Sequence, residues 1–295
     1  MGIKGLLAKL RELDKKRTIL RKVKLHDLRD RVIAFDASLY IYKWSLAAGG
    51  TIKNKDGKPI NHLQGALSSA MCMRRAGITP CYVFDGKPPV EKAATISDRN
   101  KRREDGAKTP PKLAWEETKS LFAQLGVTTL TADGEADPYL AALTMNDVAY
   151  AVATADLDLL AFGAKRVIID IDCSRGNATM IMLEDVLAAL EMTQTQFIDY
   201  CILLGSDYTA KTLPRIGPAR SFAMINKYRT IEKLLDEEKI QSPAEFTFIA
   251  ARAVFLATPP EVPVEITDKT TSASIKEWLA NAGLAGKRID NLFAQ

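Results

Sequence analysis

The chain has few of the residues that build zinc sites or disulfide frameworks. It holds four cysteines in 295 residues, with no CxxC pair, and its only histidines are His26 and His62. A structural zinc site needs about four closely spaced Cys and His ligands, so this pattern argues against one. We expect the cysteines to be small, reduced core residues of an intracellular protein: Cys72, Cys81, Cys173 and Cys201.

Long apolar runs are also missing. None approaches the roughly 20 residues that cross a bilayer, and the segment Met1 to Leu6 lacks the apolar core of a signal peptide. Position 6 is Leu, whereas myristoylation of Gly2 needs Ser or Thr there. There are no internal repeats or low-complexity segments. We therefore expect a globular, non-secreted protein without a membrane segment, as a monomer of one large or two modest domains.

Positive charge is in moderate excess. The net charge is +5 and the pI is near 8.9, which favours an anionic partner only weakly. Residues 4–31 are basic with few acids, and the leucines at 6, 7 and 10 predict a short amphipathic helix there.

Strands that end in an acid recur along the chain. Residues 32–36 and 81–85 are short apolar runs that finish with Asp36 and Asp85, and the run 148–152 is soon followed by Asp156. Helical segments separate them, so we expect a mostly parallel sheet covered by helices. Ligands of such sheets bind at the carboxyl ends of the strands, where these acids would meet.

Two pairs of acids frame residues 133–158. Glu135 and Asp137 open a helix, although Asp137 also has the position of an ordinary helix N-cap, and Asp156 and Asp158 follow the next strand. Together with Asp36, Asp85 and Asp207, these form a candidate set of seven carboxylates, which would stay ionised together only beside cations. Oxygen ligands favour Mg²⁺ or Mn²⁺ over zinc, and two such ions can promote phosphodiester hydrolysis.

Two other segments carry charge suited to phosphates. The segment Lys87 to Lys112 holds eight basic and four acidic residues, among them Lys92, Arg99, Arg102 and Arg103. Positions 92, 99 and 103 would share one helix face, although a solvated charged helix is the ordinary alternative. A tight turn over 211–218 between two helices predicts a helix–hairpin–helix whose phosphate-facing residues are Arg215, Gly217, Arg220 and Lys227.

These motifs resemble those of a flap endonuclease of the structure-specific 5′-nuclease (Rad2/XPG-like) superfamily. The resemblance runs from residue 1 to about 236, through MGIKGL, IAFDAS, YVFDGKPP, GEAD, TADLD and CILLGSDY. It implies an α/β fold: a central, mostly parallel twisted sheet with helices on both faces (a PIN-like core), a helical arch and a helical DNA-binding lobe. We expect a nuclease core over 1–209 with the arch at about 90–112, and a lobe over 210–295 with the hairpin unit at about 196–236.

The resemblance also implies residue roles. The seven acids would hold two Mg²⁺, with Mn²⁺ as a possible substitute, and Asp156 and Asp207 would be essential to cleavage. Lys92 and Arg99 match arch-base cations that contact the scissile phosphate, Tyr42 matches an aromatic residue that stacks on a base, and Gly2 matches the processed N-terminus. The implied partner is DNA with a 5′ flap or single-strand/duplex junction, with a K⁺ site near Gly217, and a nuclear or replication-site location in a eukaryotic or viral setting.

Three features depart from the family pattern. The segment between Arg103 and Gly126 is short, which leaves gap or junction cutting open beside flap cleavage. Arg215 replaces the first Gly of the hairpin's Gly-x-Gly. The end of the chain, 288–295, lacks the paired aromatics of a sliding-clamp motif, so clamp binding is a hypothesis without a motif behind it. A non-catalytic DNA-structure binder is the third alternative, but such a relative would be expected to lose some of the acids.

Overall fold

The computed structural model describes residues 2–47, 52–86, 113–209 and 211–284. Its centre is a seven-stranded sheet in the order β1-β7-β6-β5-β2-β3-β4. Strands β6, β5, β2, β3 and β4 are parallel, and β7 runs antiparallel to both β6 and β1. The strands are β1 Leu20–Lys24, β2 Val32–Asp36, β3 Thr79–Phe84, β4 Thr128–Thr131, β5 Ala151–Ala153, β6 Arg166–Asp172 and β7 Asn177–Met182. The predicted α/β class with a mostly parallel sheet is confirmed.

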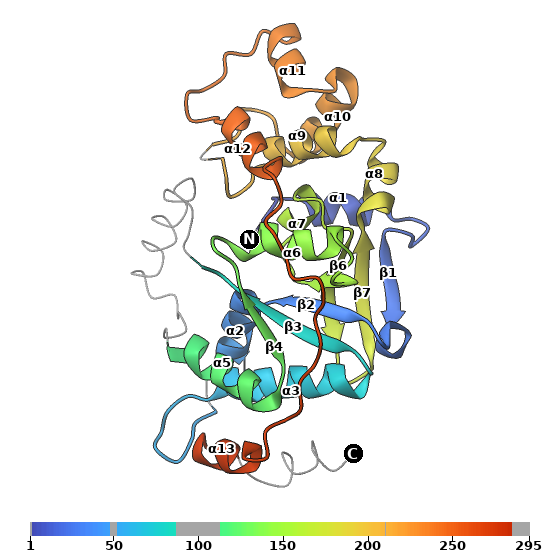
Figure 1. Cartoon of the computed structure of the whole chain (residues 1–295). Helices are drawn as coiled ribbons and strands as arrows, with labels where there is room; N and C mark the ends of the chain where they lie inside the picture. Colours follow the sequence, from blue (N-terminus) through green and yellow to red (C-terminus); the bar gives the residue numbers. More distant parts are fainter. Residues whose placement is uncertain (1, 48–51, 87–112, 210, 285–295) are drawn as a thin grey trace.

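Helices cover both faces of this sheet (Figure 1). One face packs on α2 Ala37–Leu46, α3 Asn61–Arg75, α5 Leu113–Leu125 and α13 Ile275–Asn281. The other packs on α1 Leu6–Leu13, α6 Ala136–Met145, α7 Asp158–Ala161 and α8 Leu183–Leu190. Beyond α8 lie α9 Gln194–Leu204, α10 Pro218–Tyr228, α11 Ile231–Glu237 and α12 Phe248–Phe255.

The apolar runs supply both faces because side chains alternate along a strand. In β2, Ile33 and Phe35 face the α2–α3–α5 side, and Ala34 faces the other. In β3, Tyr82 stacks between Phe35 and Phe122, with ring centroids 4.8 Å and 4.0 Å away. The central strands are thus buried on both faces, which explains their continuous hydrophobic runs.

A buried ion pair joins the helices beyond the sheet. Asp199 of α9 is 1% exposed and accepts two hydrogen bonds from Arg252 of α12, at 2.7 and 2.8 Å, and one from the backbone N–H of Ile231. Arg252 also binds Glu232 of α11. Burial raises the pKa of the Asp199 carboxyl, while the guanidinium of Arg252 lowers it. One arginine therefore connects α9, α11 and α12.

The chain after α12 returns to the sheet domain. The backbone N–H of Lys269 donates to the carbonyl of Gly126, that of Ser272 donates to Gln124, and Arg74 of α3 pairs with Asp268. The helix α13 then packs against α5 (Figure 1). A separate lobe over 210–295 stays a prediction, but residues 266–284 lie against the sheet domain.

One strand was not anticipated from the sequence. The edge strand β1 pairs with β7, with Leu20 opposite Ile181. Its sequence, LRKVK, has no apolar run because one side faces solvent, and edge strands carry such lysines.

The expectation of four reduced cysteines is wrong for two of them. Cys72 in α3 and Cys173 at the end of β6 form a disulfide with a Cα–Cα distance of 6.0 Å. They are 101 residues apart, so only the tertiary fold brings them together. Cys81 and Cys201 are free and buried, as expected.

Thiol labelling will test this disulfide. Under denaturing, non-reducing conditions, we expect an alkylating reagent to modify Cys81 and Cys201 but neither Cys72 nor Cys173, because only a free thiolate reacts. After reduction all four should be modified. Mass spectrometry of the labelled peptides measures this, and modification of all four without a reductant would contradict the pairing.

Candidate functional site

The carboxyl ends of the central strands lie at one edge of the sheet, close to the N-terminus (Figure 1). The chain passes from β2 to β3 and β4 on one side, and then returns to β5 on the other side of β2. The order of strands therefore reverses at β2, and ligands bind at such a point in open α/β sheets. Asp36 ends β2, Asp85 follows β3, and Asp156 follows β5.

Asp36 is the buried centre of this edge. It is 8% exposed, and its Oδ1 accepts the backbone N–H of Leu39 at 3.0 Å, so it also caps α2. The Thr154 hydroxyl donates to Oδ2 at 3.4 Å. Burial, together with the negative charges of Asp85 and Asp156, raises the pKa of Asp36 to about 7. Because the charges of Asp85 and Asp156 act on Asp36, these three carboxylates lie within electrostatic reach of one another.

Asp85 is fixed against the start of α6. Its Oδ1 accepts the backbone N–H of Ala136 at 2.9 Å. The backbone N–H of Gly86 donates to the carbonyl of Gly134 at 2.7 Å, so the chain after β3 runs beside the entry to α6. Glu135 is the N-cap residue and Asp137 lies in the first turn, where the helix dipole favours negative charge. Since Glu135 takes the N-cap position, the alternative N-cap assignment for Asp137 is wrong.

The second pair of acids, Asp156 and Asp158, lies in one turn that contacts Gly2 near the N-terminus. The Asp158 N–H donates to Asp156 Oδ1 at 3.0 Å, and the Asp156 N–H donates to the Thr154 hydroxyl at 3.1 Å. A Cβ added to Gly2 would lie 2.1 Å from Asp156 Oδ1 and 3.1 Å from Asp158 Oδ1. A side chain at position 2 would force the Asp156 carboxylate to move, and Gly2 has φ +80°, a backbone conformation that favours glycine. The backbone of Gly2 therefore belongs to the site.

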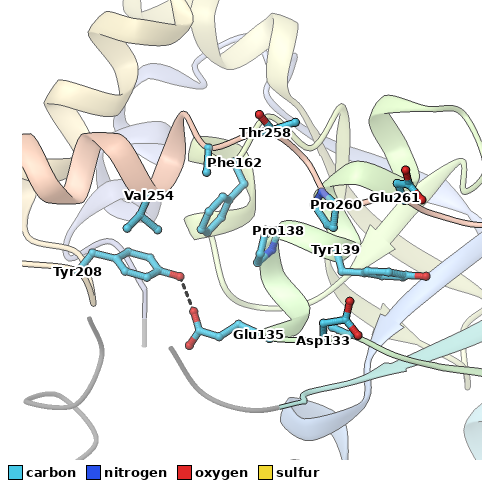
Figure 2. Close-up of a pocket in the computed structure, with 13 residues that line it drawn as sticks. Asp133, Glu135, Pro138, Tyr139, Phe162, Tyr208, Val254, Thr258, Pro260 and Glu261 are labelled. Atoms are coloured by element: carbon cyan, nitrogen blue, oxygen red, sulfur yellow. Dashed lines mark hydrogen bonds between the residues drawn. The ribbon is translucent and has the colours of Figure 1, made fainter. Parts of the chain in front are cut away.

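Tyr208 links the acids to the helices beyond the sheet. It directly follows Asp207, and its Oη donates to Glu135 Oε2 at 2.7 Å (Figure 2). Its ring packs edge-on against Phe162 and Phe255, at 5.8 and 5.2 Å. Burial and nearby carboxylates, first of all Glu135, raise the pKa of its phenol, so it stays a donor. Tyr208 ends the motif CILLGSDY, but no role was assigned to it from the sequence. Its position directly after Asp207, a predicted metal ligand, was the feature that could have indicated one.

A cleft of about 580 Å³ flanks this bond (Figure 2). It lies between the start of α6 and the chain after α12, and Tyr208, Phe162, Pro138 and Pro260 form part of its wall. Of the seven predicted ligands, only Glu135 lines it. The cleft is therefore beside the acids rather than at their centre.

The donor chemistry of the acids suits a divalent cation that prefers oxygen. The buried His62 hydrogen-bonds Glu117 on the opposite face of the sheet, so it is no competing ligand. However, no group of three or more His, Cys, Asp or Glu side chains that could hold a metal ion occurs among the described residues. The predicted ligands thus supply suitable oxygen donors and lie at the expected edge of the sheet. Their side chains, as placed in this structure, do not surround one ion.

The predicted hairpin follows α9. Arg215 has φ +63°, a left-handed conformation that glycine adopts without strain, and Gly217 caps α10 with Pro218 at its start. Arg215 thus occupies a backbone conformation that favours glycine and strains any other residue. Arg220 donates to the Arg215 carbonyl at 3.3 Å. Lys227 pairs with Glu238 at 3.6 Å, so part of its charge is compensated.

The remaining predicted site residues fall into two groups. Tyr42 of α2 is 39% exposed, on the surface as a base-stacking residue must be. Lys92, Arg99, Arg102 and Arg103, and with them the predicted arch, lie outside the described residues. No described helix is long and apolar enough to cross a membrane.

Asp36 should oppose folding when no metal is present. Its folded pKa, about 7, exceeds the ordinary 3.8, so the folded state binds the proton more tightly than the unfolded state does. The ionised carboxyl therefore lowers the free energy of unfolding, and this loss grows as pH rises from about 4 to about 7. In EDTA at pH 8, Asp36→Asn should therefore raise the free energy of unfolding, by on the order of 3 kcal/mol, while its amide oxygen keeps the α2 cap. Below pH 4 the gain should vanish.

Urea denaturation across this pH range measures the effect. Asp147→Asn is the control, because Lys165 lowers the pKa of that exposed carboxyl and no gain is expected. A gain at Asp36 that is independent of pH would contradict the electrostatic explanation.

Arg215 offers a second test. Arg215→Gly and Arg215→Ala both remove the cation, but only glycine relieves the left-handed backbone. We expect the glycine variant to be more stable than the alanine variant by about 1 kcal/mol in urea denaturation. Equal stability would show that the hairpin relaxes to another conformation.

Comparison with known proteins agrees with this arrangement. The XPG N-terminal domain family matches residues 1–106, and the XPG I-region family matches residues 126–207. Flap endonuclease 1 of Ostreococcus lucimarinus (strain CCE9901) is 35% identical over 86% of this chain and 73% of its own length. Flap endonuclease 1 of Naegleria gruberi is 33% identical over the same shares.

Solved structures share the fold. The catalytic core of Rad2 in complex with DNA substrate matches with a TM-score of 0.81 at 20% identity, over 99% of both chains. Flap endonuclease-1 from Methanococcus jannaschii matches with a TM-score of 0.72 at 21% identity, over 93% of this chain and 96% of its own. Human GEN1 in complex with Holliday junction DNA matches with a TM-score of 0.73 at 17% identity, over 95% of this chain and 73% of its own. From the two matched regions and the identity to flap endonuclease 1, the chain belongs to the XPG-like flap endonuclease family.

Proposed function

We propose that this protein is a divalent-metal-dependent, structure-specific 5′ nuclease that hydrolyses DNA at single-strand/duplex junctions, with 5′ flaps as its main substrate and 5′-exonuclease activity beside it. The observation that carries the proposal is the gathering of acids from β2, β3, α6, β5 and the end of α9 at one sheet edge. Asp36 and Asp85 each also accept an N–H group at a helix start, but the mutual repulsion of the set opposes folding, which favours a role in binding cations.

The acids would hold two Mg²⁺, for which Mn²⁺ can substitute: Asp36, Asp85, Glu135, Asp137, Asp156, Asp158 and Asp207. When bound, the ions would polarise the scissile phosphodiester and make the attacking water more acidic. Binding would also remove the repulsion that raises the pKa of Asp36.

The surrounding residues orient the acids. The α2 cap fixes Asp36, the Ala136 N–H fixes Asp85, and the Tyr208 hydroxyl fixes Glu135. Since each of these donors belongs to a helix start or a packed ring, these three carboxylates have defined orientations in the fold. Gly2 lets the N-terminal backbone approach Asp156 without a clash.

Substrate contacts come from three places. Lys92 and Arg99 would stabilise the charge that develops on the phosphate, with Arg102 and Arg103 as further cations of the same segment. The hairpin at Gly217 with Arg215, Arg220 and Lys227 binds the phosphates of duplex DNA, and the hairpin near Gly217 would also hold a K⁺ ion. Tyr42 stacks on a base at the junction.

Neutralising single acids tests the proposal. Asp156→Asn and Asp207→Asn should each abolish cleavage, because a lost ligand weakens ion binding, while DNA affinity should change little. The assay is cleavage of an end-labelled double-flap DNA with and without Mg²⁺, with the product mapped to the nucleotide and affinity measured separately in Ca²⁺. Turnover in both variants would refute the assigned centre, and binding without cleavage by the wild type would favour a DNA-structure binder.

A junction-resolving or gap endonuclease is the second candidate, because the segment between Arg103 and Gly126 is short. A panel of flap, gapped and four-way junction DNAs at equal concentration separates the two. Single-turnover rates highest for the flap support the first assignment, and rates highest for the junction or gap support the second.

A further inference from the structure

A basic segment follows α1, at the opposite end of that helix from Gly2 and the acids. Residues 15–24 hold six Lys and Arg and no acid. Arg21 pairs with Asp185, but no acidic side chain of the described residues pairs with Arg11, Lys15, Lys16 or Lys22. The acids just before this stretch face other groups: Glu12 binds Lys9, and Asp14 binds backbone.

Asp14 holds this stretch in a defined shape. Its Oδ1 accepts the backbone N–H of Ile19 at 2.8 Å and its Oδ2 accepts that of Leu20 at 3.0 Å. The Arg17 N–H donates to the Asp14 carbonyl, and Arg17 itself is left-handed, with φ +55°. Ile19, 2% exposed, anchors the far end in the core. Lys15, Lys16 and Arg17 therefore sit exposed on a closed loop, which we name the Asp14 loop, residues 14–20.

The helix before this loop, α1, and the residues that lead into it contact the hairpin region. The Lys4 N–H donates to the Gly205 carbonyl at 3.2 Å, and a Cβ at Gly5 would touch Pro218 at 3.2 Å. Lys9 lies over the ring of Phe222 in α10, 4.3 Å from its centroid. Figure 1 shows α1 beneath α9, with the chain to β1 projecting at the sheet edge. The hairpin and the Asp14 loop thus lie at the two ends of one helix.

We infer that the Asp14 loop is a second phosphate-binding surface, which holds the backbone of the duplex arm beyond the part held by the hairpin. The inference rests on the proposed function for the identity of the DNA. Its evidence is the unpaired positive charge, its fixed presentation by Asp14, and its connection to the hairpin through α1. The eight residues of α1 span about 12 Å, so the loop would meet phosphates roughly four base pairs from the hairpin contact.

Charge reversal on the loop tests this. For Lys15→Glu/Lys16→Glu we expect affinity for a long-armed flap DNA to fall about tenfold, and the slope of log affinity against log salt to become shallower by about two. DNAs whose duplex arms lengthen in two-base-pair steps should show a rise in wild-type affinity that is missing in the variant. Cleavage rate at saturating DNA should not change, because the loop does not touch the acids.

Two further variants make the test specific. Lys269→Glu/Lys276→Glu changes the net charge equally, at exposed positions on the segment near α13, and should leave affinity and salt slope as in the wild type. Asp14→Ala makes the protein more positive but frees the loop, so we expect affinity for the long arm to fall several-fold. Thermal denaturation confirms that each variant is folded.

The outcomes separate the loop from the nuclease. If both charge reversals weaken binding equally, or if Asp14→Ala binds more tightly, general electrostatic attraction explains the effect and the built loop is refuted. If the wild type shows no dependence on arm length while cleaving short-armed flaps, the loop inference fails and the proposed nuclease stands. If no DNA is cleaved by the wild type, the proposed function fails, whereas arm-length binding still reports on the loop.

Discussion

The burial of Asp36 beside the carboxylates of Asp85 and Asp156 is the constraint on which the site depends. Asp36 lies in the core with the charges of Asp85 and Asp156 close to it, and its pKa rises to about 7. A fold tolerates such a cluster only if other interactions keep the acids in place. Here the main-chain N–H groups of Leu39 and Ala136 and the hydroxyls of Thr154 and Tyr208 do so.

The same constraint connects the sheet to the helices beyond it. Tyr208 contacts Glu135 at one end and the rings of Phe162 and Phe255 along its sides. Phe255 belongs to α12, which Arg252 joins to α9 and α11 through buried Asp199. A change in the packing of these helices would therefore reach the carboxylate of Glu135 through one phenol ring. The helices α9, α11 and α12 are in this way connected to Glu135, one of the predicted metal ligands.

The N-terminal residues also connect the acids to the helices beyond the sheet. Gly2 lies against Asp156 and Asp158, where a side chain would displace the Asp156 carboxylate, and α1 then runs under the hairpin to the Asp14 loop. The first 20 residues thus contact the acids, the hairpin and the sheet edge in turn. The edge strand β1 completes this path by pairing with β7.

The sequence by itself predicted the central strands of the sheet and the seven candidate metal ligands. Apolar runs of strand length that end in Asp or are soon followed by one predicted β2, β3 and β5 and the shared edge, because parallel strands with short connections leave few other arrangements. The motif pattern also identified the family. Local signals suffice here, since strand ends and helix starts are short-range features. They failed for β1, whose lysine-rich sequence lacks an apolar run.

Tertiary structure decided what depends on distant partners. The Cys72–Cys173 disulfide joins residues 101 apart, the Tyr208–Glu135 bond spans 73, and Asp199 meets Arg252 across 53. No periodicity or composition encodes such pairs, because each arises only when separate helices and strands pack. The left-handed Arg215 is a further case: the sequence showed that Arg replaces a glycine, but only the structure shows the positive φ of 63° at this position.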